Sequence, residues 1–279
     1  MKALECGSIC SQKASGSILR PVNVVVAIFS ALFGLAFGSF LNVCISRLPQ
    51  HKSIVRPASF CPACGEPILA IDNLPLVSWI LLRGRCRHCG WHISLRYPLV
   101  EFATATLFLL TYLTFGLTLQ GAGMVVLCFL LLGLAIMDAE SLLLPNAFTL
   151  TGIVLGVAYS GLRGGWQSGL LAILYAVAAT SLVLLIRGSY WLVRKEEGMG
   201  LGDAKLLAMI AAWLGPWPSL LALFLGVLAA AIFGLVWMIL KRASMRTLQL
   251  PFGSFLCAAA IYAIFRGQPI LKWYLQFFR

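Results

Sequence analysis

The chain has 279 residues, of which 61% are apolar and only 11% are charged. A mean hydropathy of +0.94 and successive long apolar runs exclude a soluble domain and predict a multi-span membrane protein. Basic loops that fix membrane topology explain the net charge of +12 better than nucleic-acid binding does. Gly198-x-Gly200-x-Gly202 is neither a phosphate-binding loop nor a dinucleotide fingerprint, because no strand–helix unit surrounds it.

The first segment, residues 1–21, is predicted to be a flexible tail, because it is polar and lacks the apolar stretch of a cleavable signal peptide. The first apolar run is long enough to cross a bilayer and predicts a transmembrane helix at 22–45. A polar insert follows at 46–97, and we expect residues 98–279 to form the rest of the membrane core.

Eight apolar segments are candidates for membrane spans, although several are short or contain glycine. They lie at about 22–44, 98–116, 121–138, 147–163, 168–187, 203–215, 217–240 and 251–267. These segments predict an all-α polytopic membrane protein of about eight transmembrane helices, with a small zinc-ribbon-like insert in the cytoplasm.

Basic residues are spread unevenly over the segments that join these spans. With the N-terminus outside, the inside segments are 46–97, 138–147, 187–205 and 240–250. They hold fourteen of the 21 lysines and arginines, so the positive-inside rule predicts both termini outside and the insert in the cytoplasm. Asp138 and Asp203 then lie at the cytoplasmic boundary of the membrane.

The insert contains two cysteine pairs, Cys61-Pro-Ala-Cys64 and Cys86-Arg-His-Cys89, and a glycine follows each pair. Two C-x2-C pairs, each followed by glycine, are typical of zinc knuckles, which close a tetrahedron of four thiolates around structural Zn²⁺, and the 21 residues between the pairs lie just beyond the usual range. An insert with few core residues needs such a staple to fold.

Other interpretations of the cysteines are four reduced thiols or two disulfides, and disulfides are disfavoured in the cytoplasm. His88 and His92 could replace a cysteine as ligands, but solvated surface histidines are the simpler interpretation.

Asp138 and Asp203 are two of only three aspartates in the chain, and each adjoins an apolar run. A carboxylate at bilayer depth costs about 2.5–3.5 kcal/mol, so a function is expected for it. Two such carboxylates close together cannot both ionise easily, so one serves as general acid and the other as general base toward water. Gly200 and Gly202 let an extended substrate approach Asp203, and Pro145 breaks the helix after Asp138.

Three further interpretations of the two acids remain open. Asp203 could cap the helix that begins Ala204-Lys205. An ion-coupled membrane transporter would also use two membrane acids, and it predicts uptake driven by a proton gradient. A noncatalytic assembly factor held by a zinc ribbon predicts that loss of both aspartates leaves function intact.

Short motifs follow one another in a fixed order along the chain. They are Phe37-Gly-Ser-Phe-Leu-Asn-Val43, Arg47-Leu-Pro49, Cys61-Pro-Ala-Cys64, Asp72-Asn-Leu-Pro75, Gly84-Arg-Cys-Arg-His-Cys89, Arg96-Tyr-Pro-Leu-Val-Glu101, Asp138 with Leu144-Pro145, Gly200-Leu-Gly-Asp-Ala-Lys205 and Pro251-Phe-Gly-Ser-Phe255. In this order they resemble the type IV prepilin peptidases, including the type II secretion pseudopilin peptidases, over nearly the whole chain after residue 20.

This resemblance implies an intramembrane aspartic protease of the GxGD type in the bacterial inner membrane. Such enzymes cut the basic leader from prepilins or pseudopilins on the cytoplasmic side, just after a glycine. By family pattern the catalytic pair falls on Asp138 and Asp203. Many members also N-methylate the new N-terminal residue with S-adenosylmethionine, and the tetracysteine insert is associated with that activity. No residue is assigned to binding of the methyl donor.

Other motif residues are expected to support the site. Pro251 and Gly253 should shape a helix entry near it, and Lys205 should interact with Asp203 or with lipid phosphate. Arg96 and Glu101 are expected to form a boundary ion pair, with methyl-donor binding as the alternative role.

Asn146 and Glu140 lie close to Asp138 in the sequence, and each needs its own interpretation. Asn146 departs from the family pattern, which often has an aspartate there, and a changed pH optimum would follow if that acid tunes Asp138. Glu140 should point away from the dyad, since positions two apart on a helix do not share a face.

Overall fold

The computed structural model describes residues 23–195, 200–241 and 250–276, and the predicted tail at 1–21 lies outside this range. No β-strand occurs in the described residues. The elements are α1 (Val24–Arg47), η1 (Leu48–Gln50), η2 (Ala70–Asn73), α2 (Val77–Leu81), α3 (Arg96–Phe115), α4 (Leu119–Ser141), α5 (Asn146–Arg194), α6 (Leu201–Leu214), α7 (Pro216–Lys241) and α8 (Phe252–Gln276), where η marks a 3₁₀ helix. The predicted all-α class is confirmed.

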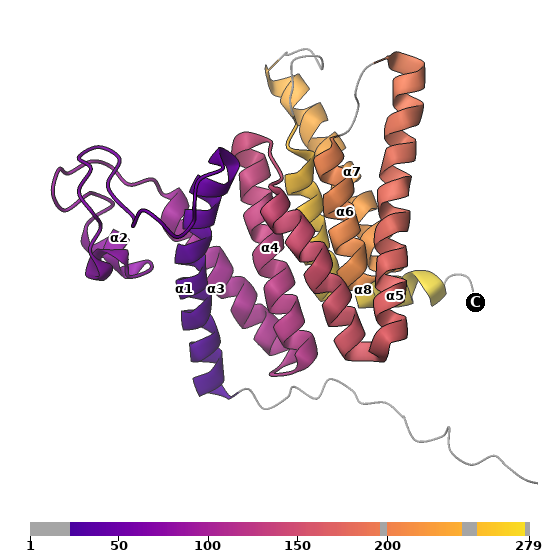
Figure 1. The fold of residues 1–279 in the computed structure, drawn as a ribbon, viewed down its shortest axis with the longest axis horizontal. Coiled ribbons are helices and arrows are strands. Elements are labelled where there is room, and N and C mark those ends of the chain that lie inside the picture. The colour runs from indigo at the N-terminus through magenta and orange to yellow at the C-terminus, as the bar shows by residue number, and fades with distance from the viewer. Residues whose placement is uncertain (1–22, 196–199, 242–249, 277–279) are drawn as a thin grey trace, which may run out of the picture.

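Helix α5 reverses direction in its middle. Gly164 and Gly165 have non-helical backbone angles, and Gly165 has a φ of +76°, which glycine adopts at little cost. Figure 1 shows the chain turning back, so that the two halves of α5 form a hairpin. These halves correspond to the two spans expected at 147–163 and 168–187.

Within the described residues, five helices (α1, α3, α4, α5 and α7) are long and apolar enough to cross a membrane, and α8 contains a shorter apolar stretch, Phe252–Gly267. Helix α6 has 14 residues and is therefore about 21 Å long, which is less than the roughly 30 Å of a hydrocarbon core. Nine of those 14 residues are buried, so α6 lies inside the bundle and carries Asp203 away from lipid.

Close packing fixes α1, the helix that leads into the insert, against α3. A Cβ atom at Gly34 would lie 2.6 Å from the Cα of Ala105, and one at Gly38 would lie 2.6 Å from the Cα of Glu101. Glycines four residues apart on one face of α1 therefore let its backbone touch α3. Residues 48–95 leave the bundle between these helices and form the insert, which stands to one side in Figure 1.

The bundle has two distinct ends (Figure 1). Helix α4 ends, and α5 and α6 begin, at the end where α1 leads into the insert, which we call the insert end. The α3–α4 turn, the reversal in α5 and the α6–α7 turn lie at the opposite end, which we call the far end.

Candidate active site and metal centre

The four cysteines of the insert come together from two turns. All four Sγ atoms lie within 4.8 Å of one another, and those of Cys61 and Cys89 are 3.8 Å apart. A tetrahedral zinc ion with Zn–S bonds of about 2.3 Å separates its sulfurs by about 3.8 Å, whereas a disulfide holds them at about 2.05 Å. Every cysteine within the described ranges is free. The arrangement therefore fits one tetrahedral metal ion better than it fits disulfides.

The backbone at each turn has the geometry of a knuckle. The N–H groups of Gly65 and Gly90 donate to the carbonyl oxygens of Cys61 and Cys86 at 2.9 and 3.0 Å. Both glycines have positive φ, at +75° and +71°, where a side chain would be strained. Backbone N–H groups, chiefly that of Cys64, lower the pKa of the Cys61 thiol to about 7. The backbone of this turn thus favours the thiolate of Cys61, which is the metal-binding form.

Glu101 connects α3 to the insert, and its partner differs from the sequence prediction. Its Oε2 atom accepts a hydrogen bond from the backbone N–H of Leu76 at 2.8 Å. Arg96 pairs instead with Glu140 of α4, with 2.7 Å between Nη1 and Oε2. The predicted Arg96–Glu101 ion pair is wrong, because residues five apart on a helix point about 140° apart. Glu140 faces this arginine, in agreement with the expectation that it points away from the dyad.

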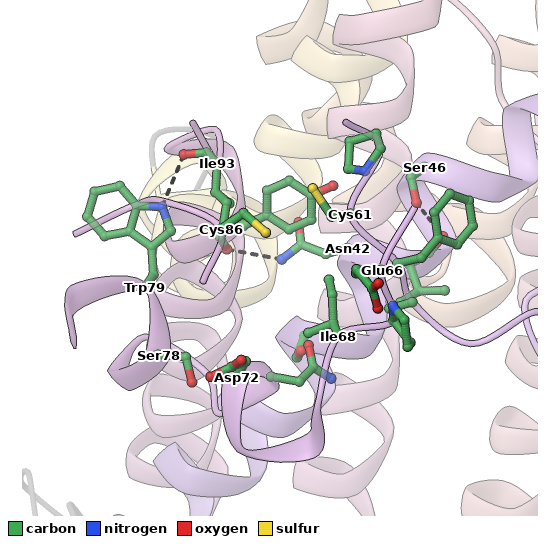
Figure 2. Close-up of a pocket in the computed structure, with 18 of the residues that line it drawn as sticks. Asn42, Ser46, Cys61, Glu66, Ile68, Asp72, Ser78, Trp79, Cys86 and Ile93 are labelled. Carbon is green, nitrogen blue, oxygen red and sulfur yellow. Dashed lines mark hydrogen bonds between the residues drawn. The ribbon is translucent and has the colours of Figure 1, made fainter. Parts of the chain in front are cut away.

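A cavity of about 590 Å³ lies between the insert and the insert end of α1 and α3 (Figure 2). Asn42 lines it, is 2% exposed, and donates from Nδ2 to the carbonyl oxygen of Tyr97 at 3.0 Å. The Oδ1 atom of Asn42 is buried and has no partner in the described part of the chain. Cys61 and Cys86 also line the cavity, so the metal knuckles form part of its wall. The unpaired oxygen marks a place for a donor group of a ligand.

Asp138 lies near the C-terminus of α4 and is bound by the start of α8. Its Oδ2 atom accepts hydrogen bonds from the backbone N–H of Ser254 at 2.7 Å and from the Ser254 hydroxyl at 3.0 Å. A Cβ at Gly253 would lie 3.0 Å from Oδ2 and Cγ of Asp138. The N–H of Ser254 also faces the carbonyl oxygen of Pro251 at 3.1 Å. Pro251 and Gly253 therefore lie at the contact between the start of α8 and Asp138, and their role in supporting the site stays a prediction.

Asp203 lies in the first turn of α6, and its Oδ2 atom accepts the backbone N–H of Gly200 at 3.2 Å. The capping interpretation is thus partly correct, because the carboxylate satisfies a free N–H group at the helix start. This bond leaves the second carboxylate oxygen available for other contacts.

One side chain, Leu144, brings the two aspartates into the same site. A Cβ at Gly202 would lie 3.1 Å from the Cδ1 of Leu144, and a Cβ at Gly253 would lie 3.2 Å from the same atom. Gly202 precedes Asp203 and Gly253 lies against Asp138, so the segments that carry the two acids meet at this leucine. Their carboxylates interact electrostatically across the site. Two residues separated by 65 positions in sequence thus form a pair.

Lys205 and Pro145 lie where α5 and α6 begin, and the partner of Lys205 differs from the predicted one. The Nζ of Lys205 donates to Oδ1 of Asn146 at 2.9 Å, so its described side-chain partner is Asn146 rather than Asp203, and the expected contact with lipid phosphate stays a prediction. Pro145 is the N-cap of α5, and its carbonyl oxygen accepts the N–H of Phe148 at 3.0 Å. The position at which the sequence departs from the family pattern therefore ties the start of α5 to the start of α6.

Two family models match the chain. The bacterial peptidase A24 N-terminal domain matches residues 32–115, and the type IV leader peptidase family matches residues 125–235. The chain is 36% identical over 271 residues to the prepilin leader peptidase/N-methyltransferase of Aeromonas salmonicida, covering 88% of this chain and 92% of the relative. The chain belongs to the type IV leader peptidase family.

Other members of the family support this assignment. The protein of the same name from Pseudomonas aeruginosa is 36% identical over 272 residues, covering 88% of this chain and 92% of the relative. That of Myxococcus xanthus is 39% identical over 223 residues, covering 79% of this chain and 66% of the relative. No solved structure matches the chain.

In this type IV leader peptidase family member, each of the two family models covers a different site. The matched range 32–115 contains the four cysteines and the lining of the 590 Å³ cavity. The matched range 125–235 contains Asp138 and Asp203. Ser254 lies outside both ranges, and sequence reasoning did not select it as a site residue. Its only signal was its place in the motif Pro251-Phe-Gly-Ser-Phe255.

Proposed function

We propose that the chain is a prepilin or pseudopilin leader peptidase that cleaves after the leader glycine, with Asp138 and Asp203 as the catalytic pair. The observation that carries this proposal is the meeting of the two aspartates around Leu144, at the insert end of the bundle. The dyad supplies both an acid and a base, which is what attack of water on an amide carbonyl requires. The names of its relatives agree with this activity.

The hydrogen bonds divide the two catalytic roles. Asp138 receives the N–H of Ser254 at 2.7 Å and shares the single hydroxyl hydrogen of Ser254 with the carbonyl oxygen of Ala135, whereas Asp203 receives one N–H from Gly200 at 3.2 Å. Donors directed at a carboxylate favour its ionised form, so the negative charge rests preferentially on Asp138. We therefore assign Asp138 as the base that takes a proton from water, and Asp203 as the acid that protonates the leaving amine.

The proposed substrate meets this dyad at the cytoplasmic face of the bacterial inner membrane. The charge asymmetry of the joining segments supports a cytoplasmic insert end. The basic leader then lies on the side of the insert, while the apolar helix of the prepilin docks among the spans. Gly200 carries no side chain beside the Oδ2 of Asp203, where a Cβ would be 3.4 Å away. This space admits the extended backbone around the scissile bond.

We assign the 590 Å³ cavity to S-adenosylmethionine, the methyl donor of a second activity on the new N-terminus. Its volume lies in the range of small-molecule sites, and its wall holds the unpaired Oδ1 of Asn42. That oxygen would accept an amino or hydroxyl hydrogen of the donor, and Trp79 and Tyr97 offer aromatic surface to its base. The donor supplies an electrophilic methyl group for the free α-amine of the cleaved substrate.

The tetracysteine site is proposed to hold structural Zn²⁺. Four ligands of one type leave no open coordination position, so the metal would stabilise the insert rather than take part in chemistry. Because Cys61 and Cys86 line the cavity, the metal would also hold its wall in place.

The first experiment measures cleavage of a prepilin in liposomes by wild type, Asp138→Asn and Asp203→Asn, with the product N-terminus read by mass spectrometry. We expect a cut after the leader glycine that drops by about 10²–10⁴-fold in each variant. Unchanged cleavage in either variant would remove the dyad mechanism. Absence of cleavage by wild type, together with uptake driven by a proton gradient, would favour a transporter.

Methyl transfer is tested separately with a substrate that already lacks its leader. Addition of S-adenosylmethionine should add the mass of one methyl group, and Asn42→Ala should lower this transfer while cleavage of the full prepilin continues. Equal methyl transfer by wild type and Asn42→Ala would place the donor elsewhere.

A further inference from the structure

The far end of the bundle contains a second cavity, of about 340 Å³, which neither the dyad nor the insert uses. It lies between the reversal in α5 and the end of α6. Its polar lining comprises Tyr159, Ser160, Arg163, Ser168 and Tyr175. A lining of hydroxyl groups and one arginine differs from the apolar surface expected of a helix turn that faces only hydrocarbon.

Arg163, the one charged residue of this lining, is held in place by buried aromatic side chains. Its Nη1 donates to the hydroxyl oxygen of Tyr159 at 3.2 Å, and its guanidinium lies 5.6 Å from the centroid of the same ring. Tyr159 is 6% exposed and stacks on Trp213, with ring centroids 5.0 Å apart. Trp213 in turn donates from Nε1 to the carbonyl oxygen of Gly152 at 2.8 Å. The arginine is therefore positioned at the cavity.

Among the residues that the structure describes, the far end supplies no carboxylate for this arginine. The sequence has no aspartate or glutamate at 102–137, 141–195 or 204–279, which are the ranges that contain every far-end turn after α3. A guanidinium with a fixed fork of N–H donors and no acid beside it suits a phosphate group, which it can bind through two parallel hydrogen bonds.

Two exposed tryptophans place the cavity at the depth of lipid headgroups. Trp166 follows the reversal in α5 and is 74% exposed, and Trp217 follows the α6–α7 turn and is 64% exposed. Tryptophan is enriched at both membrane–water interfaces, where its ring sits at headgroup level. The cavity lies between these two turns, since Gly164 and Gly215 line it.

We propose that this cavity binds the headgroup of an anionic glycerophospholipid such as phosphatidylglycerol, with Arg163 on the phosphate. The hydroxyl groups of Ser160 and Ser168 donate to the carbonyl oxygens of Ala212 and Gly164, so both serines present acceptor lone pairs to the cavity. A glycerol headgroup carries hydroxyl donors that match these acceptors. A choline headgroup has no N–H or O–H donor, and the quaternary ammonium finds no carboxylate in the lining.

The test measures lipid retention by the full-length protein in native mass spectrometry, and its thermal stability in the same detergent. The probes are phosphatidylglycerol, phosphatidylcholine and inorganic phosphate, each added alone. Wild type should retain and be stabilised by phosphatidylglycerol in preference to phosphatidylcholine. Arg163→Gln should weaken retention about tenfold or more, which is about 1.4 kcal/mol. The matched control Arg266→Gln removes the same charge from α8, outside the lining, and should behave as wild type.

Arg163→Lys keeps the charge but loses the fork of donors, so it should retain phosphatidylglycerol with intermediate strength. If Arg163→Gln does not fold, lipid retention by Arg163→Lys and the lipid preference of wild type test the proposal instead. Equal retention of the two lipids, or unchanged retention by Arg163→Gln, overturns the proposal. Stabilisation by inorganic phosphate equal to that by phosphatidylglycerol would identify a free-anion site and overturn the assignment to lipid.

Discussion

Of residues 48–95 in the insert only Cys61, Ser78 and Gly84 are buried, whereas nine of the 14 residues of α6 are buried. The insert exposes Phe60, Ile71 and other apolar side chains, and its four cysteines lie close enough together to hold a metal ion between its turns. The bundle depends on close helix packing, which small residues such as Gly38 allow. The difference indicates that the two regions can be disturbed separately. Substitution of a cysteine should affect the insert, and addition of a methyl group at a helix contact should affect the bundle.

The largest effect is expected from removal of the metal that the four cysteines would hold. Cys61→Ser removes one of four ligands, and structural zinc contributes about 10–16 kcal/mol of apparent binding free energy in small domains. We expect the insert to become sensitive to proteases, with cuts confined to residues 48–95, and the metal content to fall. Limited proteolysis and metal analysis of the purified protein measure both.

The bundle should remain folded in Cys61→Ser, because its helices pack chiefly against one another. Cys128→Ser serves as a control, since Cys128 is a buried cysteine of α4 outside the metal cluster. Proteolysis that spreads into α4–α8 in Cys61→Ser would show that the two regions fold as one unit.

The second effect concerns the contact between α8 and Asp138. Gly253→Ala places a Cβ 3.0 Å from the Cγ and Oδ2 atoms of Asp138, so the carboxylate must shift. A displaced catalytic group can cost up to about 10²-fold in rate, and we expect cleavage to fall at least tenfold. Initial rates of prepilin cleavage measure this loss. Gly188→Ala is the matched control in α5, because nothing lies within 4 Å of its added Cβ.

Sequence analysis located the acids and thiols better than it located their partners. The spacing of Cys61, Cys64, Cys86 and Cys89 predicted a cluster, because a knuckle is a local turn. The rarity of aspartates drew attention to Asp138 and Asp203, and their catalytic role stays a prediction. Contacts between helices could not be read in the same way, because they depend on how each helix is rotated in the bundle.

Particular residues show this limit. Ser254 meets Asp138 across 116 positions, and nothing in either local sequence specifies which atom of α8 faces α4. Arg96 could pair with Glu101 of its own motif or with Glu140 of α4. The rotation of the two helices in the bundle brings Arg96 to Glu140. The 590 Å³ cavity depends on how residues 48–95 fold back on α1 and α3, which periodicity does not describe.

A smaller effect is expected from Ser254→Ala. The substitution removes a hydroxyl whose single hydrogen is shared between Oδ2 of Asp138 at 3.0 Å and the carbonyl oxygen of Ala135 at 2.7 Å, but the backbone N–H bond to Asp138 remains. A lost hydrogen bond to a charged group costs about 1.5–3 kcal/mol, and the remaining N–H should keep the rate loss near tenfold. Because Asp138 would lose a donor that favours its ionised form, the acidic limb of the cleavage pH profile should move upward. Ser189→Ala, at an exposed serine of α5 that bonds its own helix, should leave both rate and profile unchanged.

The smallest effect should come from the ion pair that joins the two regions. Arg96 lies at the junction of insert and bundle, and Glu140 lies two residues after Asp138, so their bond connects the junction directly to the end of α4 that carries Asp138. Both side chains are partly exposed, at 25% and 40%, and such pairs contribute about 0.2–1 kcal/mol. A double-mutant cycle with Arg96→Gln and Glu140→Gln, measured for cleavage and for methyl transfer, should therefore give a coupling below about fivefold in either activity. A larger coupling in both activities would mean that the insert sets the position of Asp138 through Arg96. A small coupling energy would leave the packing of α1 on α3 as the main connection between the insert and the helix bundle.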